Sequence, residues 1–192
     1  MFDDLGSFLF VGCLAYGLGS IPFGLILTRM AGAGDIRQIG SGNIGATNVL
    51  RTGNKKLAVA TLIFDAGKGA AAVFLTATLV SPDLMAIAGL IVVIGHCFPI
   101  WLKFNGGKGV AALAALDFRL GAVFVIVWLV TAFLSRYSSL SALLAIAACV
   151  VTGFITLDDI TTKIAILLLG GLVWSRHHAN IGRLLTGCET KI

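Results

Sequence analysis

Charged residues are scarce in this chain. Only 12% of its 192 residues are Asp, Glu, Lys or Arg, whereas 58% are hydrophobic. Soluble domains usually carry about 25% charged residues, so this composition excludes an ordinary soluble fold. The cysteines are also too scattered for a zinc site or a disulfide framework. They are Cys13, Cys97, Cys149 and Cys188.

A basic stripe interleaved with aromatic side chains is missing as well, so no nucleic-acid partner is expected. The chain nevertheless has 14 basic residues against nine acidic ones. Membrane topology explains this excess better than nucleic-acid binding does. Because no separate soluble stretch stands between the apolar segments, residues 1–192 are predicted to form a single membrane domain.

Seven hydrophobic segments predict an all-α, polytopic membrane helix bundle, because about 20 apolar residues span a bilayer as a helix. The fourth segment is too short to cross alone and is expected to be a half-helix among the others. The segments are Leu5–Thr28, Leu57–Val80, Leu84–Leu102, Val110–Leu116, Leu120–Leu134, Leu140–Leu157 and Ile160–Trp174.

Charge placement favours an outside N-terminus and a cytoplasmic C-terminus. In that orientation twelve of the fourteen basic residues fall on the inner side, and only Arg119 and Lys163 fall outside. The positive-inside rule requires such a bias. A count that omits Val110–Leu116 would instead move a basic loop outside. With seven segments, the polar stretches Gly40–Lys56 and His96–Gly109 share the cytoplasmic face with the basic tail.

The polar run Gly40–Arg51 (GSGNIGATNVLR) stands between two hydrophobic segments. Its glycines let backbone N–H groups converge, and its hydroxyl, amide and guanidinium groups add hydrogen-bond donors. Such chemistry suits a phosphate or a similar oxyanion. GSGNIG also matches the dinucleotide fingerprint GxGxxG, but that motif must follow a strand, so no nucleotide is expected. The alternative is a plain glycine-rich connector.

A second cationic loop, Asn105–Gly109 (NGGKG), precedes the short fourth segment. Flexible backbone and Lys108 before a helix again favour anion binding. The loop is not a nucleotide-binding P-loop, because Leu102 stands where that motif needs glycine and Gly109 where it needs Ser or Thr. The alternative is a re-entrant turn whose lysine is incidental.

Four other polar features each have a structural alternative. His96 handles a proton or contacts substrate, or it is a structural hydrogen-bonding residue. Asp65 and Lys68, which share a helical face, form an ion pair, or Lys68 adds positive potential to a site. Ser139 donates a hydrogen bond to substrate, or it caps a helix. The basic tail RHHANIGR binds substrate, or it contacts anionic lipid.

Five motifs follow one another along nearly the whole chain: SGNIGATNVLR, DAGKG, GHCFPIWLKFNGGKGVA, RYSSLS and RHHANIGRLL. This series resembles the bacterial integral-membrane acyl-phosphate:glycerol-3-phosphate acyltransferases. The resemblance implies transfer of a fatty acyl group to the 1-hydroxyl of glycerol 3-phosphate, giving 1-acylglycerol 3-phosphate (lysophosphatidic acid) and phosphate for phospholipid biosynthesis. It also implies an inner-membrane enzyme with a cytoplasmic active site and no metal, nucleotide or other cofactor.

The resemblance also assigns roles to individual residues. The implied catalytic residues are Ser41, Asn43, His96, Lys108 and His177. The implied substrate-binding residues are Gly42, Gly45, Thr47, Asn48, Arg51, Gly107, Ser139 and Asn180. Direct transfer without an acyl-enzyme is expected, with the phosphate of the donor accepting the hydroxyl proton. His96 is the alternative base within the protein.

The chain departs from the family pattern at two places. After GGKGVA it continues with ALAALDFR, a shorter continuation than is usual in the family. Its serine motif reads SLSA, which keeps Ser139 in register but not Ser141. A transporter of phosphorylated metabolites is the main rival function, since it too needs basic loops and a broken helix. The short, acidic outer connections argue against it.

Overall fold

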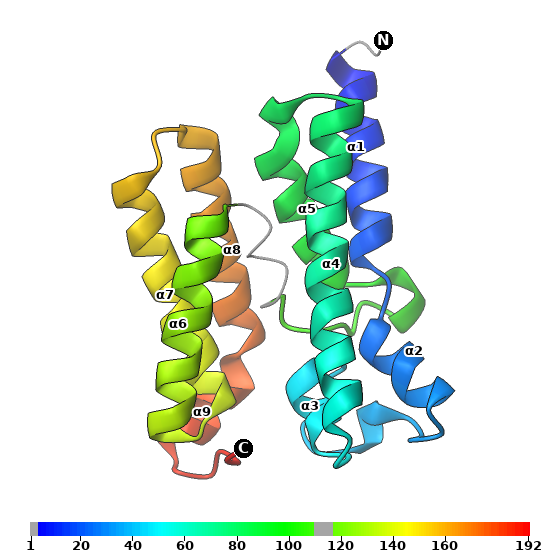
Figure 1. The fold of residues 1–192 in the computed structure, drawn as a ribbon, viewed down its shortest axis with the longest axis vertical. Helices are drawn as coiled ribbons and strands as arrows, with labels where there is room; N and C mark the ends of the chain where they lie inside the picture. Colours follow the sequence, from blue (N-terminus) through cyan, green and yellow to red (C-terminus); the bar gives the residue numbers. More distant parts are fainter. Residues whose placement is uncertain (1–3, 110–116) are drawn as a thin grey trace. The chain divides into compact units, whose positions relative to one another are not determined.

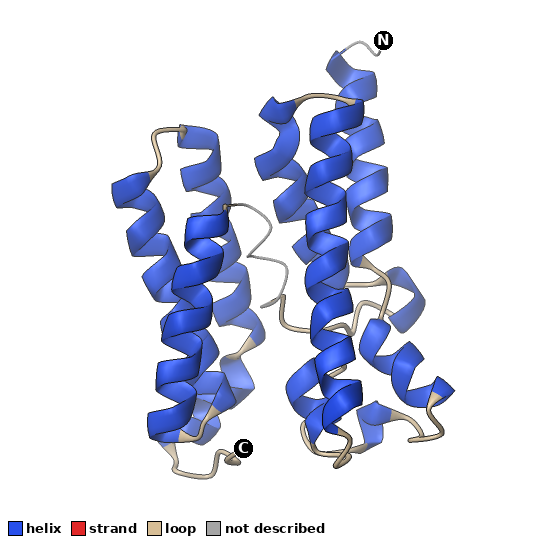
Figure 2. Ribbon diagram, in the orientation of Figure 1, coloured by secondary structure: helices blue, strands red, loops and turns tan. Residues whose placement is uncertain are grey.

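The computed structural model describes residues 4–109 and 117–192. Every regular element in these two ranges is a helix, and they contain no strand (Figure 2). The predicted all-helical class is therefore confirmed. The predicted fourth segment, Val110–Leu116, lies outside the described residues.

The described residues form two compact units, one from residues 4–109 and the other from residues 117–192 (Figure 1). The first unit contains α1 (Asp4–Gly19), α2 (Phe23–Met30), α3 (Ala46–Leu50), α4 (Lys55–Leu79) and α5 (Met85–Cys97). The second unit contains α6 (Phe118–Ser135), α7 (Ser138–Thr156), α8 (Ile160–Arg176) and α9 (His178–Leu185). In the first unit α1 packs against α4 and α5, and α2 and α3 pack against α4. In the second unit α7 lies against both α6 and α8.

The first hydrophobic segment, predicted as one helix over Leu5–Thr28, is broken. α1 ends at Gly19 and α2 begins at Phe23, because Pro22 has no backbone N–H and its ring disfavours a continuing helix. α5 likewise ends at Cys97, short of the predicted Leu102, because Pro99 disfavours helical backbone in the residue before it. Prolines therefore end two helices in the first unit.

Glycines bring α1 and α5 into backbone contact. A Cβ on Gly19 would collide with the Val92 carbonyl, and a Cβ on Gly95 would lie 2.6 Å from the carbonyl oxygen of Tyr16. Small residues at such crossings are typical of helices packed in a membrane, where close van der Waals contact drives association.

α4 has the polarity of a membrane helix, because its polar side chains are inside and its apolar ones outside. Asp65 and Lys68 are each 4% exposed. Leu62, Ile63 and Phe64, in contrast, are between 47% and 62% exposed. Water would make this arrangement unfavourable, whereas a lipid environment favours apolar side chains on the outside.

Among the residues that the structure describes, four helical stretches are long and apolar enough to cross a bilayer: Asp4–Met30, Lys55–Leu79, Pro82–Leu102 and Ser138–Thr156. These stretches identify a membrane-embedded protein. α6 contains a shorter apolar stretch, Arg119–Ser135. The count of seven segments and their orientation remain predictions.

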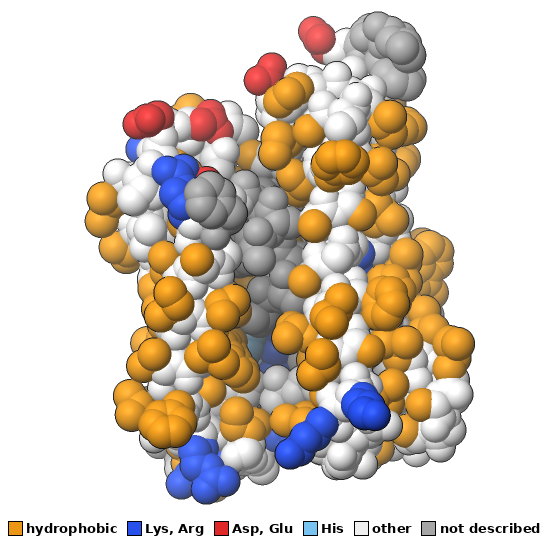
Figure 3. Space-filling view, viewed as in Figure 1, with side chains coloured by type: hydrophobic (Ala, Val, Ile, Leu, Met, Phe, Trp, Pro, Cys, Tyr) orange, Lys and Arg blue, Asp and Glu red, His pale blue; other side chains and the backbone are white. Residues whose placement is uncertain are grey.

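Each unit, taken by itself, has oppositely charged ends. On the face shown in Figure 3, acidic side chains gather at one end of each unit. Lys and Arg lie toward the other end of the first unit, whereas in the second unit they are seen at both ends. In the second unit, Asp117 and Asp159 cap the starts of α6 and α8, whereas Arg136 and Arg176 lie where those helices end. This separation is the structural counterpart of the charge asymmetry in the sequence.

Candidate functional site

The loop before α4 is organised by the buried amide of Asn48. Its Nδ2 donates to the carbonyl oxygens of Ile36 at 3.0 Å and Ile39 at 2.9 Å. The same Nδ2 reaches the Asn43 carbonyl oxygen at 2.7 Å, while Oδ1 accepts from the Ser41 N–H at 3.0 Å. The structure therefore places the Asn48 amide inside the loop, where it holds four backbone positions together.

Ile44 anchors the loop in the apolar core of the first unit. It is 2% exposed and belongs to a cluster of buried residues with Leu25, Ile36 and Val49. α2 approaches the loop so closely at Gly24 that a Cβ there would collide with the Ile44 carbonyl. The loop is thus packed against α2 through Gly24 and against α4 through Ala58 of the same cluster.

Arg51 lies beside the glycine at the start of the loop. Gly40 has a φ of 55°, and a Cβ at that position would lie 2.6 Å from Cδ of Arg51 and from Oδ1 of Asn48. Only glycine fits both the backbone conformation and this close approach. Arg51 itself is exposed, so its guanidinium stands at the surface of the loop.

Several backbone N–H groups of the loop are used to build it. Ser41 donates to Asn48, Gly42 donates to the Ile39 carbonyl at 3.0 Å, and Gly45 donates to Oδ1 of Asn43 at 3.2 Å. These amides are therefore less available to an anion than the sequence predicts. The Ser41 and Thr47 hydroxyls and the Arg51 guanidinium are the side-chain groups suited to it.

The second glycine-rich loop is folded back onto the end of α5. The Gly107 N–H donates to the His96 carbonyl at 2.9 Å, and the Gly106 N–H donates to the Cys97 carbonyl at 3.0 Å. A Cβ on Gly106 would collide with the His96 carbonyl oxygen. Lys108, the half-buried cation of the loop, directly follows this fixed backbone.

The second loop lies deep along α4. Nδ1 of His96 is 2.8 Å from Nζ of Lys68, which is near the middle of α4, about 20 Å from Lys55 at a rise of about 1.5 Å per residue. Irregular backbone at such a depth in a membrane protein is tolerated where it is buried in protein or lines a polar cavity. The depth of the loop favours a functional site over an incidental turn.

His177 is buried at the joint between α8 and α9. It is 2% exposed, and its Nδ1 lies 2.7 Å from the Val173 carbonyl oxygen. A carbonyl only accepts, so Nδ1 carries a proton. In the neutral ring, Nε2 then has the lone pair.

Glu189 joins two predicted substrate-binding residues of the second unit. Its Oε1 accepts from Oγ of Ser139 at 2.8 Å and from Nδ2 of Asn180 at 2.6 Å, and its Oε2 accepts from Nε of Arg183 at 2.6 Å. Burial alone raises the pKa of Glu189, but the hydrogen bonds from Asn180, Ser139 and Arg183 outweigh burial and lower it below the usual value. Glu189 is therefore an ionised acceptor that orients Ser139 and Asn180.

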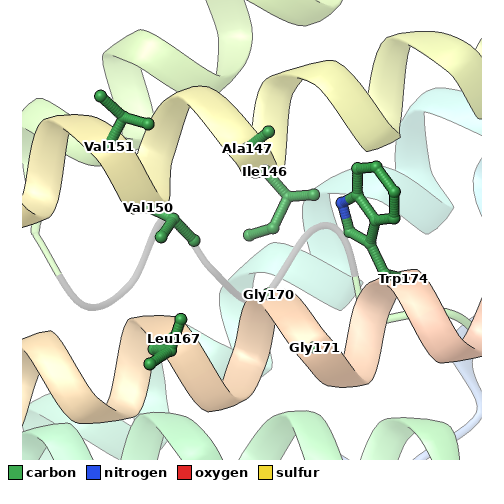
Figure 4. A pocket seen from close by; sticks show the side chains of 8 residues that line it. All are labelled: Ile146, Ala147, Val150, Val151, Leu167, Gly170, Gly171 and Trp174. Atoms are coloured by element: carbon green, nitrogen blue, oxygen red, sulfur yellow. The ribbon is translucent and has the colours of Figure 1, made fainter.

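An open apolar groove of about 470 Å³ lies between α7 and α8 (Figure 4). Its lining consists of Ile146, Ala147, Val150, Val151, Leu167, Gly170, Gly171 and Trp174. These side chains carry no ionisable group, so the groove offers apolar contact and no acid–base chemistry.

The predicted site residues therefore fall into three groups. The first loop holds Ser41, Gly42, Asn43, Gly45, Thr47, Asn48 and Arg51. The end of α5 and the second loop hold His96, Gly107 and Lys108. The second unit holds Ser139, His177 and Asn180.

Sequence reasoning missed the side chains that fix these groups. Glu189 is the only acidic residue after Arg176, and its isolation in a basic tail is a usable signal. Tyr16 and Trp101 gave no such signal in the sequence, since aromatic residues are common in membrane helices. Oη of Tyr16 donates to the Phe98 carbonyl at 2.8 Å, and Nε1 of Trp101 donates to the Ser20 carbonyl at 2.6 Å. These bonds fasten the segment before the second loop to the end of α1.

A family model described as "Glycerol-3-phosphate acyltransferase" matches residues 9–187 of this chain. A protein of that name from Brucella anthropi is 54% identical over 194 residues, covering 97% of this chain and 94% of the relative. Another, from Agrobacterium fabrum, is 53% identical over 185 residues, covering 93% of this chain and 89% of the relative.

Two solved structures share the fold. Both are crystal structures of PlsY (YgiH), an integral membrane glycerol 3-phosphate acyltransferase, one in its glycerol 3-phosphate form and one in its lysophosphatidic acid form. Their TM-scores to this chain are 0.90 and 0.89, at 34% sequence identity. Each match covers 97% of this chain and 96% of the solved one.

Proposed function

Since this chain belongs to the glycerol-3-phosphate acyltransferase family, we propose that it moves a fatty acyl group from an acyl-phosphate to the 1-hydroxyl of glycerol 3-phosphate. The products are 1-acylglycerol 3-phosphate, a phospholipid precursor, and inorganic phosphate. Both substrates carry a phosphate group, and the acyl chain of the donor is soluble in the bilayer.

The observation that carries this proposal is the pair of cationic, glycine-rich loops in the first unit. One loop presents Arg51 beside Gly40, and the other presents Lys108 after the backbone of Gly107. Guanidinium and ammonium groups are the usual partners of phosphate oxygens. Two such loops in one unit suit a reaction in which donor and acceptor are both phosphorylated.

In the proposed reaction, the 1-hydroxyl oxygen attacks the carbonyl carbon of the acyl-phosphate. The bond from that carbon to the phosphate oxygen then breaks, and phosphate leaves with the electron pair. Phosphate is a good leaving group, so an acyl-enzyme is unnecessary, and a phosphate oxygen accepts the hydroxyl proton. Lys108 and Arg51 stabilise the negative charge that develops.

The loop residues Ser41, Asn43 and Thr47 contribute hydrogen bonds to the donor in this proposal. Gly42, Gly45 and Gly107 provide the close backbone approach, and Asn48 keeps the first loop in shape. In the second unit, His177 and Asn180 contact the glycerol 3-phosphate. Ser139 donates its one hydroxyl hydrogen to Glu189, so its oxygen accepts from a hydroxyl of the acceptor and does not donate to it as the sequence predicts. Glu189 supports this role by accepting from both Ser139 and Asn180.

We further propose that the reaction takes place at the cytoplasmic side of a bacterial inner membrane, with the N-terminus outside. Placing the more basic end of each unit inside satisfies the positive-inside rule. The acceptor is water-soluble and would reach the site from the cytoplasm.

The test is acylation by the purified full-length chain in proteoliposomes. Palmitoyl-phosphate, palmitoyl-CoA and palmitoyl-acyl carrier protein are offered in turn with labelled glycerol 3-phosphate. We expect labelled acylglycerol phosphate and equimolar phosphate only with the first donor. Product formed from either thioester instead would contradict the proposed donor.

A matched pair of variants tests the phosphate contacts. Arg51→Ala and Arg29→Ala remove the same charge, but Arg29 is ion-paired with Asp35 at 3.0 Å and precedes the first loop in the sequence. We expect kcat/KM to fall about 10²-fold in Arg51→Ala, as is typical when an oriented charge contact is lost. Equal effects of the two variants would remove Arg51 from the site.

A further inference from the structure

The ammonium of Lys68 is buried in the first unit and has three acceptors around it. Nζ lies 3.0 Å from Oδ1 of Asp65, 2.8 Å from Nδ1 of His96 and 2.8 Å from the carbonyl oxygen of Ile21. The contacts with His96 and Ile21 are hydrogen bonds, and the contact with Asp65 is an ion pair. The side chain is 2% exposed.

These contacts come from three separate parts of the first unit. Asp65 and Lys68 belong to α4, His96 to the last turn of α5, and Ile21 to the break after α1. The partly negative carbonyl end of α1 adds to the attraction of the carboxylate for a positive charge. An ionisable side chain buried within a membrane helix usually faces a partner and marks a functional site.

The Lys68 contact determines which nitrogen of His96 carries the proton. A charged lysine only donates, so Nδ1 of His96 must accept, and the ring is neutral with its proton on Nε2. A protonated ring would point an N–H of Nδ1 at the ammonium 2.8 Å away, which like-charge repulsion forbids.

The proton-bearing side of His96 faces the second loop. A Cβ built on Gly107 would collide with Nε2 of His96, so ring and loop backbone are in direct contact. The Gly107 N–H also bonds the His96 carbonyl at 2.9 Å. His96 thus touches the loop with both its backbone and its ring, one residue before Lys108.

We propose that Asp65 and Lys68 are positioning residues that hold His96 as the Nε2–H tautomer against Gly107 and so fix the backbone that presents Lys108. The proposal rests on the proposed function for its kinetic consequence. It replaces the alternative of His96 as the base, since a neutral ring in this tautomer has its lone pair occupied by Lys68. Asp65 and Lys68 then act through His96 and do not touch the substrate.

The first test is spectroscopic and independent of activity. The full-length chain, labelled with ¹⁵N-histidine, is studied by long-range ¹H–¹⁵N correlation in detergent micelles at neutral pH. The His96 signals are assigned by their loss in His96→Gln. We expect the wild-type ring to be the Nε2–H tautomer and Lys68→Met to show a mixture of tautomers. A wild-type Nδ1–H tautomer, or no change in Lys68→Met, would overturn the proposal.

The second test is kinetic. Lys68→Met should lower kcat/KM about 10²-fold, since displacement of a reacting group by about 1 Å has effects of that size. Asp65→Asn, which keeps the shape of the side chain, should act in the same direction and serves if Lys68→Met does not fold. Wild-type kinetics in a folded variant whose His96 tautomer has changed would overturn the positioning role.

Thr76→Val is the matched control on α4. The Thr76 hydroxyl is buried but has no hydrogen-bond partner among the described residues, and valine has nearly the same shape. This variant should keep both the His96 tautomer and the wild-type rate. If the wild type shows the Nε2–H tautomer and Lys68→Met the mixture, yet neither acylates glycerol 3-phosphate, the network stands and the proposed function fails.

Discussion

The two buried histidines, one in each unit, have opposite hydrogen-bonding arrangements. His96 in the first unit has Nδ1 as an acceptor, 2.8 Å from the ammonium of Lys68. His177 in the second unit has Nδ1 as a donor, 2.7 Å from the Val173 carbonyl. In the neutral rings, Nε2 of His96 therefore bears the proton and Nε2 of His177 bears the lone pair.

This difference assigns different roles to His96 and His177, although both are histidines and the sequence alone does not distinguish them. A ring whose lone pair is bound to a lysine is suited to holding a backbone in place. A ring anchored through an N–H at Nδ1 has its lone pair on Nε2, and an imidazole nitrogen of that kind has the chemistry to accept a hydrogen bond or a proton. The comparison favours His177 over His96 wherever the reaction needs an acceptor on the protein.

The largest predicted effect is that of His177→Asn. The asparagine amide can still donate to the Val173 carbonyl, but nothing replaces Nε2. We expect kcat to fall about 10³-fold, as when a hydrogen-bonding group oriented toward the transition state is lost, while the protein stays folded. The rate is measured as phosphate release from palmitoyl-phosphate in the presence of glycerol 3-phosphate.

His178→Asn is the control for that prediction. His178 is exposed, and its Nδ1 makes the same kind of contact, 2.9 Å from the Ser175 carbonyl oxygen. Its replacement should change the rate little. If His178→Asn and His177→Asn lose activity equally, the distinction drawn from the Nδ1 contacts is wrong.

Gly107→Ala is expected to have the next largest effect, because it disrupts the contact between His96 and the second loop. The new methyl group would collide with Nε2 of His96, whose ring is held by Lys68. The loop must then move, and a shift of about 1 Å in Lys108 would lower kcat/KM about 10²-fold. Steady-state kinetics in detergent provide the measurement.

Gly67→Ala is the matched substitution in the same unit. A Cβ at Gly67 has open space within 4 Å, so this variant should keep its activity. If Gly107→Ala were equally harmless, the ring of His96 would not be fixed against the loop. The role assigned to His96 in the comparison of the two histidines would then be wrong.

The sequence allowed the prediction of the helices and of the polar loops, because both depend on local composition. Six hydrophobic segments within the described residues correspond to helical stretches, and the main differences are the ends set by Pro22 and Pro99. A run of apolar residues signals burial or lipid contact, but it does not reveal where a proline will interrupt the helix.

The hydrogen-bond partners could not be predicted in the same way. The roles of Asn48 and Glu189 depend on contacts with residues up to 50 positions away along the chain, as between Ser139 and Glu189. The same holds for Lys68 and Ile21, which are 47 positions apart. Sequence patterns show which side chains carry chemistry, whereas the fold decides which of them face each other.

A smaller effect is predicted for Glu189→Gln, which tests the support of the second unit's site. The glutamine keeps the shape but loses the charge that accepts from Ser139, Asn180 and Arg183. We expect unfolding to require about 2 kcal/mol less at neutral pH, since hydrogen bonds to charged groups contribute about that much. The measurement is thermal unfolding in detergent.

The stability difference between the wild type and Glu189→Gln should also depend on pH. The pKa of Glu189 is lower in the folded chain than in the unfolded one, so its contribution is fully present above the ordinary glutamate pKa of about 4.3. It disappears as the pH falls through the lowered value. The difference in unfolding free energy between the wild type and Glu189→Gln should therefore disappear at acidic pH. A difference that does not change with pH would show that the charge of Glu189 plays no part.

The smallest effect is predicted for Asp159→Ala, at the opposite end of α8 from His177. The Asp159 carboxylate caps the helix by accepting from the N–H groups of Thr161 and Thr162. Loss of such a cap destabilises a helix by about 1 kcal/mol, whereas Asp158→Ala, which removes the neighbouring charge, should cost less. Neither should alter kcat, because the contact between His177 and Val173 lies at the far end of the helix. A drop in kcat for Asp159→Ala would mean that the position of His177 depends on the whole of α8 and not on that local bond.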